Sequence, residues 1–432
     1  MSGHRRGQLL AIVIALGVTV PGVAVRLGAA HPGEVAAAAV FGVAIVGAAF
    51  LMAWGAEVLQ LDLSQGLSLA VLALIAVLPE YAVDFTFAWK AGADPDTYSS
   101  LALANMTGGN RLLIGIGWSL VVLLAAYRVR RIARERGYTG PVDTDVDLGR
   151  SHSVEIAFLA LATAFSFTIP IQRTLSLWSG AILVTIFVVY MVRISRAPAE
   201  EPDLIGPASL VGELPPTRRR VVVGCMLVAA AGVILLVAEP FAEALVDTGA
   251  NFGVSTFLLV QWVAPIASES PELLVAGLFA WRLNTSAGLG TLVSSKVNQW
   301  TLLVGTLPFV FAISAGGLHG LPIDAVQREE LFLTAAQSAF AVAILANRSI
   351  DVREATTLLV LFLGQFVLGA VVPASVHGIE RIVVGVIYLV LAACIGFRQR
   401  HALPRLFRDG FRTPVREMIR ESDDSRAQPV AP

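Results

Sequence analysis

The chain has 432 residues, of which 56% are hydrophobic and only 15% are charged, and its formal net charge is −1. A water-soluble protein of this length carries far more charge, so this composition excludes a soluble globular protein and is typical of a polytopic membrane protein. The near-zero net charge and the lack of a basic domain give no indication of nucleic-acid binding.

Apolar stretches long enough to cross a bilayer as helices recur along the whole chain. The first follows a short basic start, and we interpret it as a retained span rather than a signal peptide because no convincing cleavage site accompanies it. We predict about twelve spans in chain order, at residues 8–27, 35–59, 66–90, 98–127, 153–171, 174–194, 221–245, 252–282, 286–314, 327–346, 354–374 and 378–398.

Arginine clusters orient these spans. They follow the fourth, sixth, tenth and twelfth spans, and Arg5 and Arg6 precede the first. With twelve spans all of these segments lie on one side, which the positive-inside rule assigns to the cytoplasm. Only Lys90 and Lys296 are lysines, which is typical of a GC-rich bacterial genome. We therefore expect a multi-pass protein of a bacterial plasma membrane with both termini in the cytoplasm.

Two proline–glutamate pairs, Pro79-Glu80 and Pro271-Glu272, lie inside predicted spans. Both are followed, at matching positions, by a valine, a Phe-Ala-Trp triplet and a terminal cation. A carboxylate inside a span is costly and marks a functional site. Proline also frees the carbonyl four residues earlier, which for Pro271 is that of Ala267. A carboxylate beside a free carbonyl offers oxygen ligands to a hard cation.

The two pairs belong to a larger internal repeat. Ala56-Glu57 and the Gly-Leu-Ser that follows correspond to Ala242-Glu243 and a later Gly-Val-Ser, so spans two to six and seven to eleven form two copies of one unit. Because five spans is an odd number, the second copy is inverted, as in secondary transporters. We expect an all-α polytopic membrane protein of about twelve helices, with an inverted five-plus-five repeat and one extra helix at each end. The predicted parts are an N-terminal extra span, a first repeat, a cytoplasmic linker, a second repeat, a C-terminal extra span and a cytoplasmic tail, at 1–30, 31–196, 197–220, 221–376, 377–400 and 401–432.

Polar residues gather around both proline–glutamate pairs. Glu80 and Asp84 share one helical face, as do Glu269 and Glu272. The spans that follow add hydroxyl and amide oxygens, and this ligand set suits Ca²⁺, Na⁺ or protons rather than a soft metal. The predicted cation-binding residues are Glu80, Asp84, Thr107, Asn110, Ser268, Glu269, Glu272, Ser295, Asn298 and Gln299. Asp84 has an alternative interpretation as a solvated residue near the end of its span, and Glu57 and Glu243 are interpreted as interfacial.

Two basic residues, Arg111 and Lys296, occupy matching places in the two repeats, and buried among the acids both would partly neutralise them. Lysine shifts its pKa readily when buried, whereas arginine does not. Lys296 is therefore a candidate titratable stand-in for a bound cation, with Glu269 as the expected partner and Glu272 and Glu80 as further candidates. A static salt bridge is the alternative for Lys296, and a purely structural ion pair is the alternative for Arg111.

With these residues in view, the chain resembles the calcium/cation antiporter superfamily, which contains the sodium/calcium exchangers. The resemblance covers spans two to eleven. It rests on Ala73–Glu80 with Ala102–Arg111, and on Pro265–Glu272 with Gly290–Gln299. It implies that Glu80 and Glu272 bind the transported metal ion.

The chain departs from the family pattern at several positions. The hydroxyl residue before Pro-Glu is kept as Ser268 in the second repeat, whereas Ala76 and Val77 occupy this region in the first. The Gly-Ser-Asn of the family becomes Met106-Thr107-Gly108 and Ser294-Ser295-Lys296, and a later Asn or Asp becomes Arg111 and Gln299. Fewer neutral ligands and two added bases favour proton coupling over a site for several Na⁺ ions.

The favoured function is a secondary active antiporter that exchanges Ca²⁺ or Na⁺ against H⁺ or Na⁺ by alternating access. Its expected partners are the lipid bilayer and inorganic cations, with no cofactor and no nucleic acid. A transporter of another solute on the same fold is the runner-up. An intramembrane enzyme, a sensor or a channel are alternatives from other classes; the sequence contains no HExxH or Gly-x-Ser-x-Gly motif for an enzyme.

Overall fold

The computed structural model describes residues 3–62, 77–138, 140–196, 204–252, 255–371 and 377–419. The chain divides into two compact units, which are described separately. Unit 1 comprises Met1–Gly109, Ala199–Glu272 and Leu307–Pro322, and unit 2 comprises Asn110–Pro198, Leu273–Thr306 and Ile323–Pro432.

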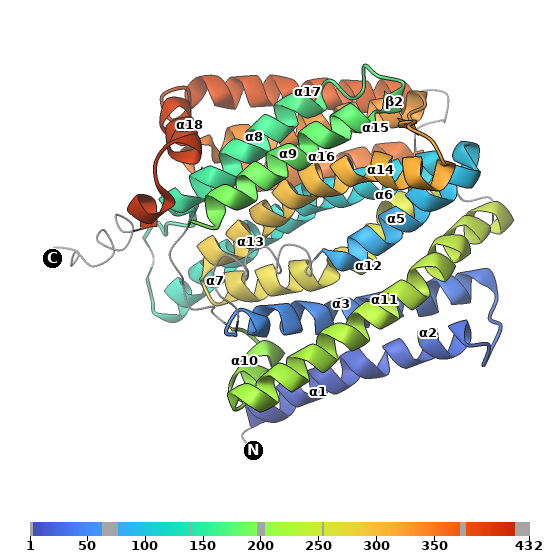
Figure 1. Ribbon diagram of the computed structural model, residues 1–432. Helices are drawn as coiled ribbons and strands as arrows, with labels where there is room; N and C mark the ends of the chain where they lie inside the picture. The colour runs from blue at the N-terminus through green and yellow to red at the C-terminus, as the bar shows by residue number, and fades with distance from the viewer. Residues whose placement is uncertain are drawn as a thin grey trace. The chain divides into compact units, whose positions relative to one another are not determined.

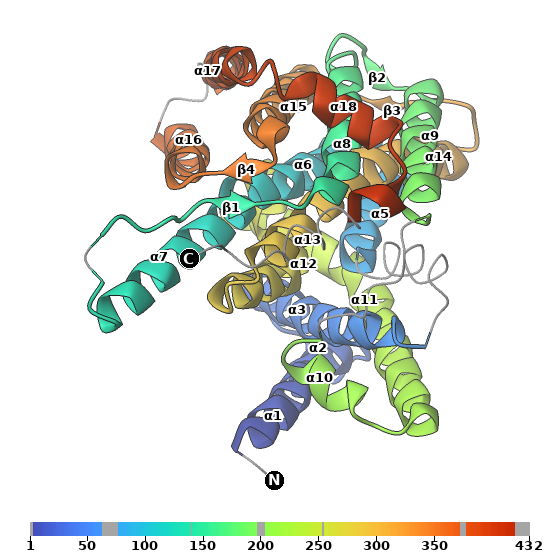
Figure 2. The same cartoon turned by 90° about the vertical axis from the view of Figure 1, so that its left-hand side faces the viewer.

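Unit 1 is built around two long helices that run side by side, α3 and α11 (Figures 1 and 2). Its core contains Met52, Trp54 and Ile234, whereas Val228 and Leu235 on α11 are 74% and 66% exposed. Large apolar side chains on an outer face are expected where the solvent is lipid. Its elements are α1 (Gly3–Gly17), α2 (Thr19–Arg26), α3 (Glu34–Leu59), α5 (Leu78–Ala93), α10 (Pro207–Gly212), α11 (Pro216–Phe252) and β3 (Leu321–Pro322).

Unit 2 contains two helix pairs that matter for its polar residues: α15 packs against α17, and the C-terminal helix α18 packs against α8 (Figure 2). A short antiparallel pairing joins β1 to β4, with Val146 opposite Ile350. Its elements are the π-helical turn η1 (Leu113–Trp118), α7 (Ser119–Glu135), β1 (Val146–Asp147), the 3₁₀ turn η2 (Arg150–His152), α8 (Ser153–Ser166), β2 (Thr174–Leu175), α9 (Leu177–Ile194), α13 (Thr285–Asn298), the π-helical turn η3 (Gln299–Leu303), α15 (Ala325–Ile344), the 3₁₀ turn η4 (Leu345–Asn347), β4 (Ser349–Ile350), α16 (Val352–Val371), α17 (His377–Arg398) and α18 (Leu403–Phe411).

Three helices contribute residues to both units: α6 (Pro95–Leu112), α12 (Thr256–Trp281) and α14 (Val304–Ala315). The division falls between Gly109 and Asn110 in α6 and between Glu272 and Leu273 in α12. The predicted site residues are therefore distributed over both units.

Nine helical segments in the described part of the chain are long and apolar enough to cross a membrane. They correspond to nine of the predicted spans; the other three, at 66–90, 153–171 and 354–374, contain α5, α8 and α16. The all-helical membrane fold is thereby confirmed, whereas the count of twelve stays a prediction. Residues 66–76 of the third predicted span, 197–203 of the linker and 420–432 of the tail lie outside the described residues.

The two proline–glutamate pairs differ in local structure. Pro271 lies inside α12, as predicted, but Pro79 lies in the first turn of α5, which begins after Val77. Proline costs little there because the first backbone N–H groups of a helix have no intrahelical acceptor. The prediction that both prolines interrupt a helix was therefore wrong for Pro79. Glu80 instead lies at the positive end of a helix dipole.

Candidate cation-binding site

The two glutamates of the repeated motif interact electrostatically within unit 1. Glu80 on α5 is 4% exposed and interacts with Glu272 of α12, with Asp84 and with the hydroxyl of Ser268. Like charges in a region of low polarity repel each other, and binding a cation or a proton relieves that repulsion. The arrangement thus favours the exchange of a bound cation for protons.

Asp84 is fully buried, which excludes its interpretation as a solvated residue at a span end. Its Oδ1 accepts a hydrogen bond of 2.8 Å from Nδ2 of Asn105 on α6. Thr107, also buried on α6, donates its hydroxyl to the backbone carbonyl of Leu103 at 2.8 Å. The Thr107 oxygen keeps a lone pair for a ligand, but its proton is used within its own helix.

The stretch of α12 before Pro271 brings further polar groups into unit 1. Ser268 is 3% exposed, and its hydroxyl makes long contacts to the carbonyls of Ala264 and Pro265, at 3.3 and 3.4 Å. Glu269 is fully buried and Glu272 is half-buried. Among the described residues no group of three or more His, Cys, Asp or Glu side chains is arranged to hold a metal ion. A cation bound by the two glutamates needs further oxygens, because a hard cation such as Ca²⁺ takes six to eight.

Unit 2 holds the lysine. Lys296 of α13 is fully buried, and its Nζ donates to Asn110 of α6 at 2.7 Å from Oδ1 and 3.3 Å from the backbone oxygen. Its ammonium also lies 4.3 Å from the centroid of the Trp300 ring, a cation–π contact. The ammonium thus occupies oxygens of the kind that a metal ion would use. Pairing of Lys296 with Glu269 stays a prediction.

The neighbouring candidates in the second repeat are also buried: Ser295, Asn298 and Gln299 are 8%, 3% and 1% exposed. A π-helical turn follows the candidate stretch in both repeats, η1 shortly after Arg111 and η3 from Gln299 onwards. π-turns within α-helices occur frequently at functional sites. Sequence periodicity did not indicate either turn.

Arg111 is paired within unit 2 by residues that the sequence analysis missed. It is 1% exposed and donates to Oε2 of Glu330 on α15 and, at 2.9 Å, to Oε1 of Gln365 on α16. Glu330 also forms a second ion pair: Nε of Arg381 on α17 donates to its Oε1 at 2.7 Å. The sequence offered one indication of these partners, because Glu330 and Arg381 are charged residues near the starts of apolar spans. The ion-pair interpretation of Arg111 is confirmed, while a role in transport stays a prediction.

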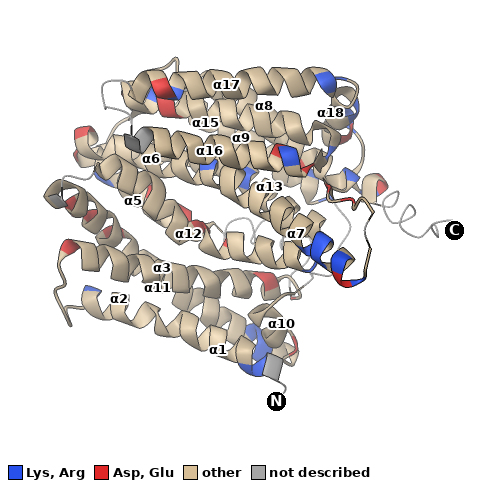
Figure 3. Cartoon of the chain, turned by 180° about the vertical axis from the view of Figure 1, so that it is seen from behind, with Lys and Arg blue, Asp and Glu red and all other residues tan. Residues whose placement is uncertain are grey.

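The arginine-rich segments of unit 2 meet at one end (Figure 3). Asp409 of α18 accepts two hydrogen bonds from Arg150, at 2.8 and 3.0 Å, and lies 3.7 Å from Arg348. Arg193 donates to the backbone oxygens of Asp409, Gly410 and Thr413. The hydrogen bonds from Arg150 hold the pKa of Asp409 below its usual range. Segments before α8, after α9 and after α15 therefore share one end, as the predicted orientation requires.

A similar cluster closes one end of unit 1. Arg219 of α11 makes a two-bond ion pair with Asp62, at 2.8 and 2.9 Å, and Arg220 adds a third bond at 2.9 Å. The Arg219 hydrogen bond lowers the pKa of Asp62 to about 2. At the other end, Lys90 pairs with Glu243 at 2.6 Å. The interfacial interpretation of Glu243 agrees with this exposed pair.

Apolar helices with outward-facing hydrophobic side chains, together with buried carboxylates contributed by two copies of one motif, define a polytopic secondary transporter. The family model described as "Sodium/calcium exchanger protein" matches residues 33–195 and 222–372. The chain belongs to this family. The two matched segments confirm the duplicated unit, and the chain is a secondary active cation antiporter rather than an enzyme.

Solved structures agree with this assignment. The crystal structure of the H⁺/Ca²⁺ exchanger CAX is 39% identical, covers 96% of this chain and 99% of its own, and superposes with a TM-score of 0.84. The Ca²⁺/H⁺ antiporter protein YfkE is 15% identical, covers 89% of this chain and 100% of its own, and has a TM-score of 0.57, a likeness of fold alone. A comparison with curated protein sequences gave no match.

Proposed function

We propose that this protein exchanges Ca²⁺ for protons, with Glu80 and Glu272 as the central ligands of both. The observation that carries the proposal is the interaction of buried Glu80 with Glu272 and with Ser268 in unit 1. Two carboxylates neutralise one divalent cation, and the same two groups are neutralised by protons when the cation leaves. Ca²⁺ and H⁺ then exclude each other at one site, which is the condition for antiport.

The residues of the site divide the task. Glu80 and Glu272 supply up to four oxygens to a cation that takes six to eight. Ser268 adds a hydroxyl, and Asp84 adds a carboxylate that Asn105 orients. Thr107 and Glu269 are the further candidate ligands of unit 1. The candidates Asn110, Ser295, Asn298 and Gln299 belong to unit 2.

Two observations favour protons over Na⁺ as the exchanged ion. The first repeat has Ala76 and Val77 where the family has hydroxyl residues, so neutral ligands for Na⁺ are missing. The solved relative with 39% identity is an H⁺/Ca²⁺ exchanger. Exchange of Na⁺ for H⁺ is the second candidate, since carboxylate and amide oxygens also bind Na⁺.

The orientation belongs to the same proposal. The arginine clusters that bind α18 and Asp62 are the predicted cytoplasmic segments. Their gathering at one end of each unit supports a bacterial plasma-membrane protein with both termini in the cytoplasm.

Uptake into proteoliposomes tests the function. Ca²⁺-free vesicles with an acidic interior should take up radiolabelled Ca²⁺ when an outward proton gradient is imposed, and Na⁺ gradients should not replace it. Glu80→Gln and Glu272→Gln should each reduce uptake to background. Glu243→Gln is the matched control, because Glu243 pairs with Lys90 at the exposed end of the same unit. Wild-type uptake in either Glu80→Gln or Glu272→Gln would contradict the ligand assignment, and uptake driven by Na⁺ alone would contradict proton coupling.

A further inference from the structure

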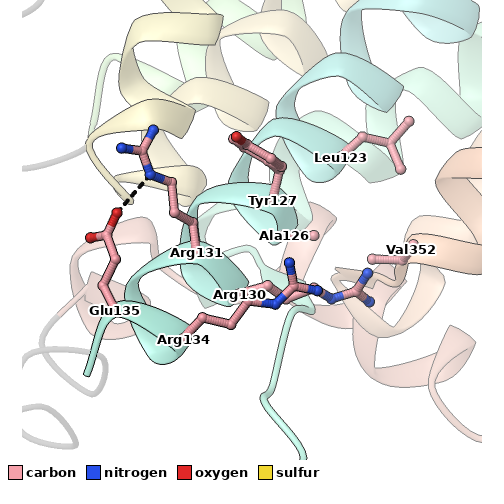
Figure 4. Close-up of a pocket in the computed structure, with 8 residues that line it drawn as sticks. All are labelled: Leu123, Ala126, Tyr127, Arg130, Arg131, Arg134, Glu135 and Val352. Atoms are coloured by element: carbon pink, nitrogen blue, oxygen red, sulfur yellow. Dashed lines mark hydrogen bonds and ion pairs between the residues drawn. The ribbon is translucent and has the colours of Figure 1, made fainter. Parts of the chain in front are cut away.

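A hollow of about 330 Å³ lies at the basic end of α7 in unit 2 (Figure 4). Leu123 and Tyr127 of α7 and Val352 at the start of α16 contribute its apolar wall. Arg130, Arg131 and Arg134 lie further along α7. The hollow therefore changes from apolar to cationic along the helix axis.

This change in polarity lies where the membrane surface is expected. Helix α7 is apolar up to Tyr127 and basic from Arg128 onwards. Tyrosine is enriched at the membrane interface and arginine beyond it. Together with α6 and η1, α7 forms a continuous helix of 41 residues, which spans about 60 Å, twice the hydrocarbon thickness of a bilayer. The basic turns consequently extend to the level of the lipid headgroups.

The arginines of this end differ in what they contact. Arg128 stacks over the Trp281 ring, 4.9 Å from its centroid, and Arg131 pairs with Glu135 at 2.7 Å. Arg130 and Arg134 extend instead toward Val352, away from Glu135 (Figure 4). Among the residues that line the hollow, Glu135 is the only acid, and it is held by Arg131.

Arg130 and Arg134 are four residues apart on one face of the helix, so their like charges repel each other. An anion bound between them removes that repulsion, and guanidinium groups bind phosphate oxygens with two parallel hydrogen bonds. An apolar wall continuous with such an anion site fits a ligand that carries both a phosphate and a hydrocarbon chain.

We propose that this hollow binds an anionic phospholipid, with the phosphate on Arg130 and Arg134 and an acyl chain against Leu123, Tyr127 and Val352. A soluble phosphate compound would use the arginines but leave the apolar wall uncovered. The site lies on the helix that continues from α6 and η1, so an occupied hollow braces the end of a helix that carries candidate ligands.

The test measures lipid binding to the full-length detergent-solubilised protein by native mass spectrometry, with phosphatidylglycerol titrated against phosphatidylcholine. The double variant Arg130→Gln/Arg134→Gln should lower the affinity for phosphatidylglycerol by about tenfold or more, because two charge-assisted contacts are lost. The matched control is Arg128→Gln/Arg136→Gln, which removes the same charge from the same end of α7 at residues that do not line the hollow. Thermal unfolding of both variants checks that they are folded.

Retention of phosphatidylglycerol by the control but not by the pocket variant supports the site. An equal loss in both variants would overturn it, since that is the result expected of a diffuse basic surface. Inorganic phosphate is the second probe. Displacement of phosphatidylglycerol by millimolar phosphate, or equal binding of phosphatidylcholine, would overturn the phospholipid assignment.

Discussion

Lys296 and Asn110 come from the two different repeats of the chain and are joined by a hydrogen bond of 2.7 Å from Nζ to Oδ1. Both residues are fully buried. The ammonium thereby holds an amide oxygen that is also a predicted ligand of the transported cation. A tethered cation at such an oxygen competes with a mobile one, because two like charges nearby disfavour each other.

The first prediction concerns this competition. If cation binding displaces a proton from Lys296, the lysine contributes about one to the slope of log apparent Ca²⁺ affinity against pH, because that slope counts the protons released per bound cation. Lys296→Met should lower that slope by about one and extend binding over a wider pH range. Isothermal titration at several pH values measures it. Lys90→Met is the control, since Lys90 is the other lysine of the chain and pairs with Glu243 at an exposed end. A less stable Lys296→Met variant with an unchanged slope would show a strut rather than a competitor.

Gly108 allows α6 and α12 to approach closely in unit 1. A Cβ at this position would lie 1.8 Å from the backbone oxygen of Gln261, far inside contact distance. Gly108→Ala should force the helices apart, at a cost of about 1–3 kcal/mol or more, and should reduce exchange because Asn105 and Thr107 lie on the same helix. Thermal unfolding and flux measure both effects. Gly232→Ala in α11 has open space around the new Cβ and should instead stabilise by about 0.5–1 kcal/mol. Equal behaviour of the two variants would contradict the packing argument.

Glu330 bridges Arg111 and Arg381, so its neutralisation removes the carboxylate that buried Arg111 contacts, whereas Arg381 keeps a second ion pair with Glu329 at 3.0 Å. Glu330→Gln should destabilise the protein by about 3–5 kcal/mol, the usual cost of breaking a buried ion pair. The unfolding temperature in detergent should fall clearly. Glu135→Gln breaks the exposed pair with Arg131 and should change it little. An unchanged unfolding temperature in Glu330→Gln would mean that the network contributes nothing to stability.

The packing of α18 against α8 should weaken at acid pH. The pKa of Asp409 lies below its ordinary value of 3.8, chiefly because Arg150 donates hydrogen bonds to the carboxylate. A depressed pKa contributes stability that is complete above the ordinary value and is lost as the pH falls through the pKa of the docked state. Docking should therefore hold at neutral pH and weaken below about pH 3.8.

Asp409→Asn should reproduce the acid state at neutral pH. Hydrogen exchange of residues 403–411 should become faster in this variant, whereas the exposed Glu417→Gln in the same segment should leave it unchanged. Exchange rates that match the wild type in Asp409→Asn would show that Arg193 and its backbone contacts hold the helix without the carboxylate.

The sequence by itself determined the membrane class, the duplicated unit and the pair of glutamates. The membrane class follows from the transfer free energy of individual residues, and the duplicated unit follows from the recurrence of Pro-Glu with matching neighbours. Neither requires knowledge of a tertiary contact. The prediction that the arginine clusters share one side of the membrane rests on the same kind of reasoning. The sequence did not show that Pro79 lies in the first turn of α5 whereas Pro271 lies inside α12, because the start of a helix depends on tertiary contacts as well as on local sequence.

Only the tertiary structure decided the partners of the buried charges. Lys296 contacts Asn110, 186 positions away, and Arg111 contacts Glu330, 219 positions away. Such pairs depend on the rotation and register of packed helices, and a rotation of one residue, about 100°, points a side chain at a different neighbour. The sequence therefore indicated that Lys296 and Arg111 need partners, and helix packing selected the amide for one and the carboxylate for the other.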